Sequence, residues 1–387
     1  MRVYGVIGAN YGDEGKGMVS AHIRHHSDPA QTVTILTNGG AQRGHTVDSF
    51  DHRFVFHHLG ASQMGDCNVT YCPAPFVINP MVLAQDLRDI KSWCTEKPVV
   101  YINPECLVTT PFDMMANQIE ELAASCDASC KGRWGSTGMG VWHTKQRSRF
   151  IKLTAGELFT NVLRLPGAIE DTLLRICDYW KDRMFLYKST PFPGYEAYAE
   201  LFETGMLITR WVQDVIELSS LVHIGSPFGD GLYTTVIFEN AQGLMLSQER
   251  GEHSTSSVTG ARAIADIVAA EKLCDPKDVR LCYVSRTYVT RHGDGPLPLE
   301  CPQELLHTEM VDKTNVWNQW QGSLRYGIVQ PGILAPAIVS DISKAGMSRD
   351  EATVVMTHTN EVPYRLSLNM PVVEVDNPYM TEDHGIV

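Results

Sequence analysis

Short apolar segments recur along the chain, and most of them are bounded by Gly, Asn, Asp or Pro. They are rich in Val and Ile, which is typical of strands buried on both faces of a mostly parallel sheet. We predict eight such strands, at residues Val3–Ile7, Thr32–Leu36, Arg53–Phe56, Val99–Ile102, Leu221–Ile224, Thr234–Phe238, Val279–Val284 and Thr353–Met356.

Helix-like segments lie between these strands. The predicted helices are Met18–Arg24, Pro80–Ile90, Phe112–Cys126, Ala155–Trp180, Tyr195–Leu218, Gly260–Leu273 and Ile333–Ala345. Strands that alternate with helices predict an α/β fold, in which helices flank a central, mostly parallel sheet. Ligands of such a sheet bind at the carboxyl ends of its strands.

The pattern contains no internal repeat, no low-complexity segment and no linker rich in Gly, Ser or Pro. We therefore expect one domain over residues 1–387, with a helix-rich subdomain inserted at 151–218. The chain has 387 residues, of which 43% are hydrophobic, and this is enough for a large buried core.

Composition narrows the class of protein only slightly. The net charge of −13 argues against a nucleic-acid polymer as partner, because polymer binding needs a basic face. We expect no membrane segment, because no run of about 18 apolar residues is present. The ten cysteines lack metal-ligand spacing and indicate reduced thiols, so we expect a cytoplasmic enzyme or binding protein.

The segment after the first predicted strand has the composition of a phosphate-binding loop. Gly8–Gly17 is rich in glycine and leads into a helix, whose N-terminus favours an anion. Lys16 can reach a terminal phosphate. Asp13 and Glu14 suit a phosphate site only if a Mg²⁺ ion bridges them to it, or if one carboxylate accepts a proton during a reaction.

A second glycine-rich loop, 38–47, follows the second predicted strand. It holds His45 between Gly44 and Thr46. Histidine is the side chain most easily poised to exchange a proton near neutral pH. We expect this loop to face the first one, with His45 as a general acid.

The two loops resemble those of the adenylosuccinate synthetase family. YGDEGKG at 11–17 is similar to the family's WGDEGKGK, and GGAQRGHT at 39–46 to GGxNAGHT. Four later matches follow in the same order: GSTGMGV at 135–141 (GTTGRGIGP), ENAQG at 239–243 (EGAQG), STSS at 254–257 (VTSS) and TRHGDGPLPLE at 290–300 (TRVGxGPxPTE). Six ordered matches are far more specific than any one loop.

The resemblance implies a P-loop NTPase-like sheet with a helix-rich insertion, and a two-step ligation. A base removes the N1 proton of a 6-oxopurine monophosphate, a triphosphate phosphorylates O6, and the amine of L-aspartate displaces that phosphate. By this resemblance Asp13 is the base, His45 the acid and Lys16 a phosphate ligand. The Asp13 side chain and the Gly44 carbonyl would bind Mg²⁺.

The resemblance also assigns three sets of binding residues. For the triphosphate they are Gly12, Glu14, Gly15, Gly17, Gly44, Thr46 and Asn360. For the purine monophosphate they are Gln42, Ser136, Thr137, Arg147, Arg149, Gln242 and Thr255. For aspartate they are Gln321, Gly322, Ser323 and Arg325.

The family completes its site with one arginine from a partner subunit. In this sequence that residue is Arg147 or Arg149, and spacing does not separate them. The resemblance therefore implies a homodimer.

Three departures from the family pattern bear on specificity. In the second loop, Gln42 and Arg43 replace Asn and Ala, which places an extra cation beside the phosphate site or in solvent. The arginine-rich TGRxRRxGW becomes WQGSLRYGI at 320–328, so Arg325 alone remains to clamp a carboxylate, and a deoxyribose becomes acceptable. Asn360 replaces the Asp that reads guanine, so the phosphate donor is GTP or ATP.

The purine remains open between IMP and GMP or dGMP. The length fits the compact archaeal type and its viral relatives, some of which act on dGMP and would work in a host cytoplasm. Asp13 favours IMP, because those viral relatives commonly have a small residue at that position, which makes room for the 2-amino group.

Two rival classes compete with the ligase. A non-enzymatic nucleotide-binding regulator is favoured by the altered aspartate loop and disfavoured by Asp13, Lys16 and His45. A GTPase or kinase of the P-loop type would need Ser or Thr after the lysine, where this chain has Gly17.

Overall fold

The computed structural model describes residues 1–49, 52–62, 69–94, 96–126, 135–184, 192–251, 253–306, 315, 317, 319–362, 366–375 and 386. A nine-stranded sheet dominates it, with the strand order β16-β15-β11-β1-β10-β2-β5-β7-β9. Every neighbouring pair in this order is parallel. The predicted α/β class, a mostly parallel sheet flanked by helices, is confirmed.

The strands of this sheet are β1 (Arg2–Gly8), β2 (Thr32–Leu36), β5 (Val69–Cys72), β7 (Val99–Ile102), β9 (Val222–Ile224), β10 (Thr235–Gly243), β11 (Arg280–Arg286), β15 (Ala352–Thr357) and β16 (Val372–Glu374). The helices are α1 (Lys16–His25), α2 (Pro80–Asp89), α3 (Pro111–Cys126), α4 (Val141–Arg147), α5 (Ala155–Asn161), α6 (Pro166–Met184), α7 (Tyr195–Glu203), α8 (Met206–Ser219), α9 (Ala261–Glu271) and α10 (Pro331–Ala345).

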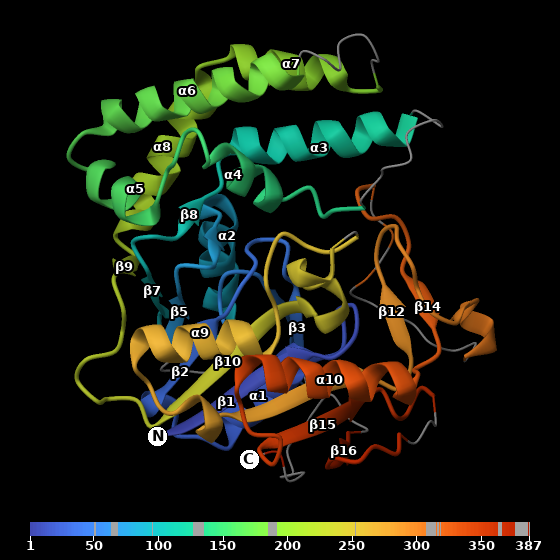
Figure 1. The fold of residues 1–387 in the computed structure, drawn as a ribbon. Coiled ribbons are helices and arrows are strands. Elements are labelled where there is room, and N and C mark those ends of the chain that lie inside the picture. Colours follow the sequence, from blue (N-terminus) through green and yellow to red (C-terminus); the bar gives the residue numbers. More distant parts are fainter. Residues whose placement is uncertain are drawn as a thin grey trace.

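The central strand β1 shows how the sheet is covered on both faces. Val3 and Ile7 point into one core, which α9 and α10 close. Tyr4 and Val6 point to the other face, where they pack against α1. Successive strand residues face opposite sides, so a strand covered on both faces is apolar at every position, as its sequence predicted. Figure 1 shows α9 and α10 lying across one face of the sheet.

The remaining helices form a layer beyond α4 and α2 (Figure 1). Helices α5, α6 and α7 lie within the range predicted to be helix-rich, 151–218, and α8 extends one residue beyond it, to Ser219. Their apolar side chains join one continuous core with β2, β5 and β7. No described helix has the length and apolar character needed to cross a membrane.

Two of the predicted helices were expected to be continuous, but each is two separate helices in the structure. The segment Ala155–Trp180 is two helices, because Pro166 begins α6 and cannot continue α5. The segment Tyr195–Leu218 is also two helices, since α7 ends at Glu203 and Gly205 precedes α8.

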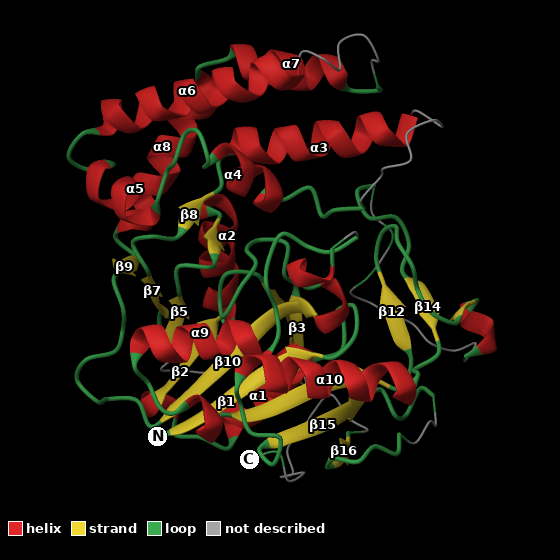
Figure 2. Cartoon of the chain, in the orientation of Figure 1, coloured by secondary structure: helices red, strands yellow, loops and turns green. Residues whose placement is uncertain are grey.

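One predicted strand belongs elsewhere. The segment Arg53–Phe56 lies in β4 (His52–Phe56), which pairs with β3 (His45–Ser49) in an antiparallel hairpin outside the main sheet. Strands β5 and β16 of the main sheet were missed in the sequence. Two small sheets complete the fold, a parallel pair of β6 (Val77–Ile78) and β8 (Leu107–Val108), and antiparallel β12 (Val289–Arg291), β14 (Arg325–Gly327) and β13 (Glu300–Cys301). Strands β12 and β14 stand beside the main sheet (Figure 2).

Candidate active site

Glu14 holds the first loop closed. Its Oε1 accepts the backbone N–H groups of Asn10 at 3.0 Å and Gly12 at 2.9 Å, and its Oε2 accepts Lys16 Nζ at 2.7 Å. The Glu14 and Lys16 side chains are only 1% and 3% exposed. Glu14 was predicted to contact phosphate or metal, but its carboxylate is engaged within the loop and organises it. Lys16 lies where the loop enters α1, as predicted.

Asp13 adopts a left-handed backbone conformation, with φ of 62°. This region is unfavourable for most residues other than glycine, so the neighbouring structure has to hold it. Arg286 Nε donates to the Asp13 carbonyl, Thr290 Oγ1 donates to the Gly12 carbonyl at 3.3 Å, and Thr357 Oγ1 donates to the Glu14 carbonyl at 2.7 Å. Strand β12, strand β11 and strand β15 thus hold the backbone of the residue predicted to be the base and of its two neighbours.

The first and second loops meet at Gly17. A Cβ atom at this position would lie 2.7 Å from the Thr46 carbonyl oxygen and 3.2 Å from His45 Cβ. Glycine is therefore required for this approach of α1 to β3. The contact brings His45 beside the phosphate-loop helix, which was the predicted relation of the two loops. His45 and Thr46 lie at the start of β3, and Gly44 is exposed just before them.

A buried cluster behind His45 was not predicted. His45 Nδ1 and Arg43 Nη2 both contact Glu239 Oε1, and the N–H of Ala61 donates to Glu239 Oε2 at 2.9 Å. Arg43 Nη1 also donates to the carbonyls of His57 and Leu59, both at 3.1 Å. His45 Nδ1 also lies 2.8 Å from Arg43 Nη2, which can only donate, so this ring nitrogen contacts a donor as well as an acceptor.

Burial and charge set the protonation of this cluster. Desolvation, with the nearby Arg43 charge, lowers the pKa of His45 to about 3, so the ring is neutral at physiological pH. Burial alone would raise the pKa of Glu239, but Arg43 and His45 outweigh it, and the pKa lies below its ordinary value. The cluster is therefore a buried Arg43–Glu239 ion pair that holds a neutral histidine.

Arg43 thus occupies neither of its two predicted positions. It does not lie free beside a phosphate, and it does not point to solvent, because its side chain is fully buried against Glu239. Gln42, the other unusual residue of this loop, is half-buried, and its Oε1 has no hydrogen-bond partner in the part of the chain that the structure describes.

The loop that carries Ser136 and Thr137 packs against the segment after β12. A Cβ at Gly135 would clash with Cα of Gly293, and Gly135 has φ of 65°, so glycine is required on both counts. Ser136 accepts a hydrogen bond from Asn117 Nδ2 at 2.8 Å. Thr137 is half-buried, and among the described residues its hydroxyl has no hydrogen bond. It remains available to a ligand.

Gln242 and Thr255, also predicted to bind the monophosphate, lie on either side of a turn after β10. Gln242 is half-buried with φ of 66°. The Thr255 hydroxyl donates to the carbonyl of Leu246 at 2.9 Å, so it helps to shape its own loop.

Lys145 of α4 contacts the same segment and was missed in the sequence. Its Nζ donates to the Ser256 carbonyl at 2.5 Å and to Ser257 Oγ at 3.0 Å. No carboxylate pairs with it among the described residues. Desolvation lowers the pKa of Lys145 to about 8. An incompletely paired, desolvated cation is a favourable partner for a phosphate.

Arg147 and Arg149, the two candidates for a shared arginine, have opposite surroundings. Arg147 is fully buried, donates to both carboxylate oxygens of Asp113 at 2.8 and 3.2 Å, and also bonds the carbonyls of Val108 and Ile151. Its predicted contact with the monophosphate is therefore not open to it, since this ion pair would have to break. Arg149 is exposed just beyond the end of α4.

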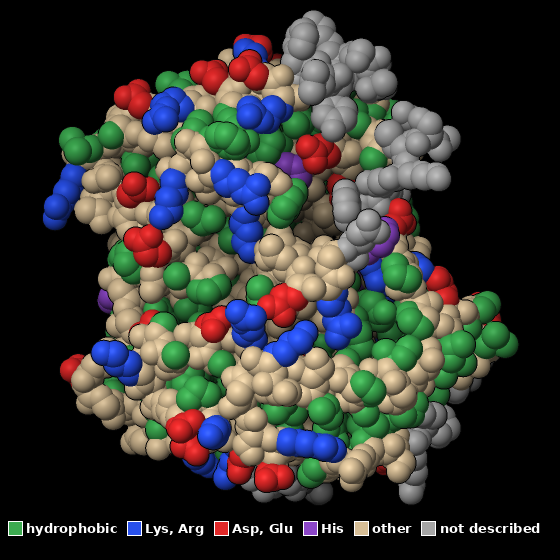
Figure 3. Space-filling model, in the orientation of Figure 1, with side chains coloured by type: hydrophobic (Ala, Val, Ile, Leu, Met, Phe, Trp, Pro, Cys, Tyr) green, Lys and Arg blue, Asp and Glu red, His purple; other side chains and the backbone are tan. Residues whose placement is uncertain are grey.

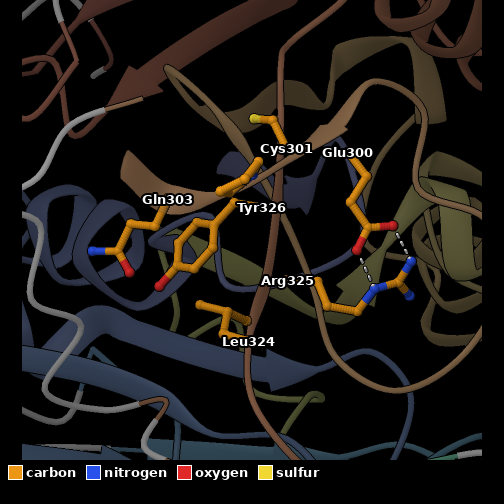
Figure 4. A pocket seen from close by; sticks show the side chains of 7 residues that line it. Glu300, Cys301, Gln303, Leu324, Arg325 and Tyr326 are labelled. Atoms are coloured by element: carbon orange, nitrogen blue, oxygen red, sulfur yellow. Dashed lines mark hydrogen bonds and ion pairs between the residues drawn. The ribbon is translucent and has the colours of Figure 1, made fainter. Parts of the chain in front are cut away.

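Arg325, the predicted aspartate clamp, is engaged with its own chain. It forms a two-point ion pair with Glu300, at 2.8 Å from Nε and 2.5 Å from Nη2, and its Nη1 donates to the carbonyls of Gly293 and Gly295. Figure 4 shows this pair at the side of a shallow pocket of about 470 Å³, which Leu324 and Tyr326 also line. Of the other predicted aspartate ligands, Gln321 and Gly322 are half-buried and Ser323 is exposed.

The segment predicted to read the donor base follows β15. Asn360 is exposed there. Its neighbour Glu361 accepts the Tyr288 hydroxyl at 2.5 Å, and that hydroxyl accepts Arg286 Nη1 at 2.8 Å. Since Arg286 also holds the Asp13 carbonyl, hydrogen bonds connect this segment to the first loop.

The residues missed in the sequence share one property. Glu239, Lys145 and Arg286 act through partners more than a hundred positions away, at separations of 194, 111 and 273 residues. Glu239 stands inside the ENAQG motif, so its position was a signal, but only the fold reveals that its carboxylate lies behind His45.

Comparison with known proteins agrees with this arrangement. The sequence profile of adenylosuccinate synthetase matches residues 5–318. The chain is 26% identical to adenylosuccinate synthetase of Bifidobacterium animalis subsp. lactis and 25% identical to that of Synechocystis sp.. The alignments cover 84% and 78% of this chain, but only 68% and 63% of those bacterial enzymes.

Two solved structures have the same fold. Succinoaminodeoxyadenylate synthetase of cyanophage S-2L, bound to dGMP and to dATP as an energy donor, superposes with a TM-score of 0.64 at 17% identity, over 98% of this chain and 94% of that one. Fully ligated adenylosuccinate synthetase of Plasmodium falciparum gives a TM-score of 0.62 at 18% identity, over 92% and 77%. With the profile matching most of its length, the chain belongs to the adenylosuccinate synthetase family.

Proposed function

We propose that this protein is a nucleoside triphosphate-dependent ligase that joins the amine of L-aspartate to C6 of a 6-oxopurine nucleoside monophosphate. The observation that carries the proposal is the meeting of the two loops at Gly17, which gathers Asp13, Lys16 and His45 at one edge of the sheet. This combination offers a base, a cation and a proton-exchanging ring to one reacting group.

In the first step, the Asp13 carboxylate takes the proton from purine N1, which leaves an anion on O6. That oxygen attacks the terminal phosphorus of the triphosphate, and the bond to the leaving diphosphate breaks. Lys16 then leaves its ion pair with Glu14 and binds the phosphate oxygens. In the second step the aspartate amine attacks C6, the C6–O6 bond breaks, and inorganic phosphate leaves with the oxygen.

His45 would act on the transferred phosphoryl group. In the tautomer whose Nδ1–H donates to Glu239, Nε2 must gain a proton before it can donate to a phosphoryl oxygen. The approaching negative charge and the Glu239 carboxylate together favour the imidazolium form, although burial opposes it in the free protein.

The residues present fit a magnesium ion. The Asp13 carboxylate is partly exposed and Gly44 is exposed, so a carboxylate oxygen and a backbone carbonyl oxygen are available as hard ligands. No three His, Cys, Asp or Glu side chains of the described residues gather into a metal site. Mg²⁺ would therefore take further ligands from phosphate, whose charge it would neutralise during transfer.

For the purine monophosphate, Thr137, Gln242 and Lys145 are the side chains best placed to bind it. We take IMP as the leading substrate and GMP or dGMP as the alternative, with GTP or ATP as the phosphate donor. The related cyanophage fold was solved with dGMP and dATP, which is a reason to test deoxynucleotides and adenine donors directly.

A homodimer completes the proposal. Arg149 is the candidate for the arginine shared between subunits, because Arg147 is buried in an ion pair with Asp113. Trp142 and Phe150, which belong to the same segment of chain as Arg149, are 46% and 68% exposed and suit burial at a subunit interface.

The proposal is tested with the purified protein, L-aspartate, Mg²⁺ and either GTP or ATP, in separate reactions with IMP, GMP and dGMP. We expect a succinyl-purine monophosphate from at least one of them, detected by mass spectrometry, with one diphosphate and one phosphate released per product. If no succinyl-purine forms in any combination while the triphosphate binds, the ligase assignment is wrong and the regulator becomes the better interpretation.

A further inference from the structure

His292 departs from the family pattern and lies against the candidate base. The motif at 290–300 has His where the family has an apolar Val. In the structure His292 Nε2 lies 3.4 Å from Asp13 Oδ2. The two side chains are 14% and 24% exposed, so the contact is mostly shielded from water.

A second contact defines the tautomer of this ring. His292 Nε2 lies 3.1 Å from Asn315 Oδ1, and this oxygen can only accept. With this oxygen as its hydrogen-bond partner, Nε2 carries the proton, and Asp13 Oδ2 lies slightly farther from the same nitrogen, at 3.4 Å. The other ring nitrogen, Nδ1, is buried and has no hydrogen-bond partner among the described residues. No second hydrogen bond from those residues therefore orients the ring.

The backbone next to His292 contacts a second part of the candidate site. The next residue, Gly293, is pressed against Gly135 of the loop that carries Thr137. His292 thus lies between the residue proposed to deprotonate the purine and the loop proposed to hold the purine nucleotide. Oδ2 is the Asp13 oxygen in contact with His292 Nε2, and Oδ1 accepts no hydrogen bond from any described residue.

We propose that His292 is a positioning residue for Asp13: its Nε2–H donates to Oδ2, fixes the rotation of the carboxylate, and so directs Oδ1 toward purine N1. The inference rests on the proposed role of Asp13 as the base. A hydrogen bond to a charged group, and correct orientation of a base, each affect rate by about one to two orders of magnitude.

The test compares variants that lack the donor, His292→Phe and His292→Val, with His292→Gln, which keeps an N–H. With the purine that the parent protein converts, we expect kcat to fall about tenfold or more in the first two, while KM for the triphosphate stays within about twofold. His292→Gln should recover most of the rate. His223→Val, on the edge strand β9, serves as the matched control and should equal the parent.

A double variant separates positioning from general damage. In an Asp13→Asn background, which cannot act as the base, adding His292→Phe should change the residual rate by less than about twofold. Full activity of both donor-less variants, failure of Gln to rescue, or a further loss in the Asp13→Asn background would each overturn the role of His292. These results leave the ligase proposal intact, whereas a parent protein that forms no succinyl-purine removes the proposed function itself.

Discussion

At the residue scale, two carboxylates of the candidate site have contrasting surroundings. The Asp13 side chain is partly exposed and its Oδ1 accepts no hydrogen bond from the described residues, while Glu239 is buried and contacts Arg43, His45 and the Ala61 amide. The first is suited to receive a proton, and the second to stay ionised and hold a cation. Replacing each one should therefore have a different consequence.

Asp13→Ala removes the proposed base and should abolish turnover, by at least about two orders of magnitude. Its affinity for the triphosphate should change little, because Lys16 and the first turn of α1 remain. Activity is followed by product formation and affinity by calorimetry. Near-parental turnover in this variant would remove Asp13 from the role of base.

Glu239→Gln leaves the buried guanidinium of Arg43 without its carboxylate. Removing one partner of a buried ion pair commonly costs about 3–5 kcal/mol, so the free energy of unfolding should fall by roughly that amount. Urea denaturation measures it. The control is Asp48→Asn, which breaks the exposed pair with Arg53 and should cost less than about 1 kcal/mol. Equal losses in both variants would contradict the described burial.

Lys145 should make binding of the purine monophosphate depend on pH. Burial lowers the pKa of its ammonium group to about 8, so the free protein loses this charge as pH rises through that value. Affinity for the monophosphate should therefore decrease between pH 7 and pH 9, as measured by calorimetry. Lys145→Met should bind more weakly at pH 7 and lack this decrease. An unchanged slope in the variant would exclude Lys145 from the site.

At the scale of elements, the C-terminal end of α4 places one arginine in the protein interior and the next at the surface. Arg147 points inward to Asp113, which also accepts Trp180 Nε1 at 2.8 Å, so one carboxylate joins α3, α4 and α6. Arg149, two residues later, points outward. Spacing along the sequence cannot distinguish them, since the choice depends on which side faces α3.

We therefore expect replacement of these two arginines to have different effects on stability and on activity. Arg147→Ala should lower the midpoint of thermal unfolding by several degrees, because Asp113 is left buried and unpaired. Arg149→Ala should leave the midpoint within about one degree but lower activity at least about tenfold. Differential scanning calorimetry and the product assay check both. Strong destabilisation by Arg149→Ala alone would reverse the assignment.

Several elements of the fold could be predicted because their signal is local. Apolar runs identified β2 and β7 with their observed bounds, and Gly-rich segments identified both loops. The breaks at Pro166 and Gly205 were missed because helical periodicity continues on both sides of them. The hairpin β3–β4 was not distinguished from the main sheet, since strand pairing is a long-range property that composition does not encode.

At the scale of the whole molecule, the parallel sheet gathers distant motifs at one edge. The carboxyl ends of β1, β10, β11 and β15 are neighbours, and they carry the first loop, the ENAQG motif, Arg286 and the segment with Asn360. The resemblance predicted which residues meet there. It could not predict that Arg43 and Arg325 are already paired within the chain, because Glu239 and Glu300 reach them only in the folded structure.

The surface supports the expectation drawn from composition. On the described part of the face in Figure 3, Lys and Arg are interspersed with Asp and Glu and form no continuous basic surface. This arrangement, with the net charge of −13, favours small ligands held locally over an extended polyanion.

A shared arginine predicts complementation between two inactive variants. If Arg149 acts in the partner's site, mixed dimers of Asp13→Ala and Arg149→Ala chains contain one intact site. After co-refolding of equal amounts, about a quarter of the parental activity should return, since roughly half of the dimers are mixed and each has one working site of two. Sedimentation should show a dimer. No recovery, or an active monomer, would contradict a shared site.

The pairing of Lys16 with Glu14, and of Arg43 with Glu239, makes the loop region nearly neutral before any ligand arrives. With His45 uncharged as well, a bare triphosphate would meet no surplus of positive charge. A triphosphate that carries its own divalent cation brings much less negative charge and exposes fewer free oxygens. We therefore expect the two loops to bind the metal complex of the triphosphate in preference to the free nucleotide.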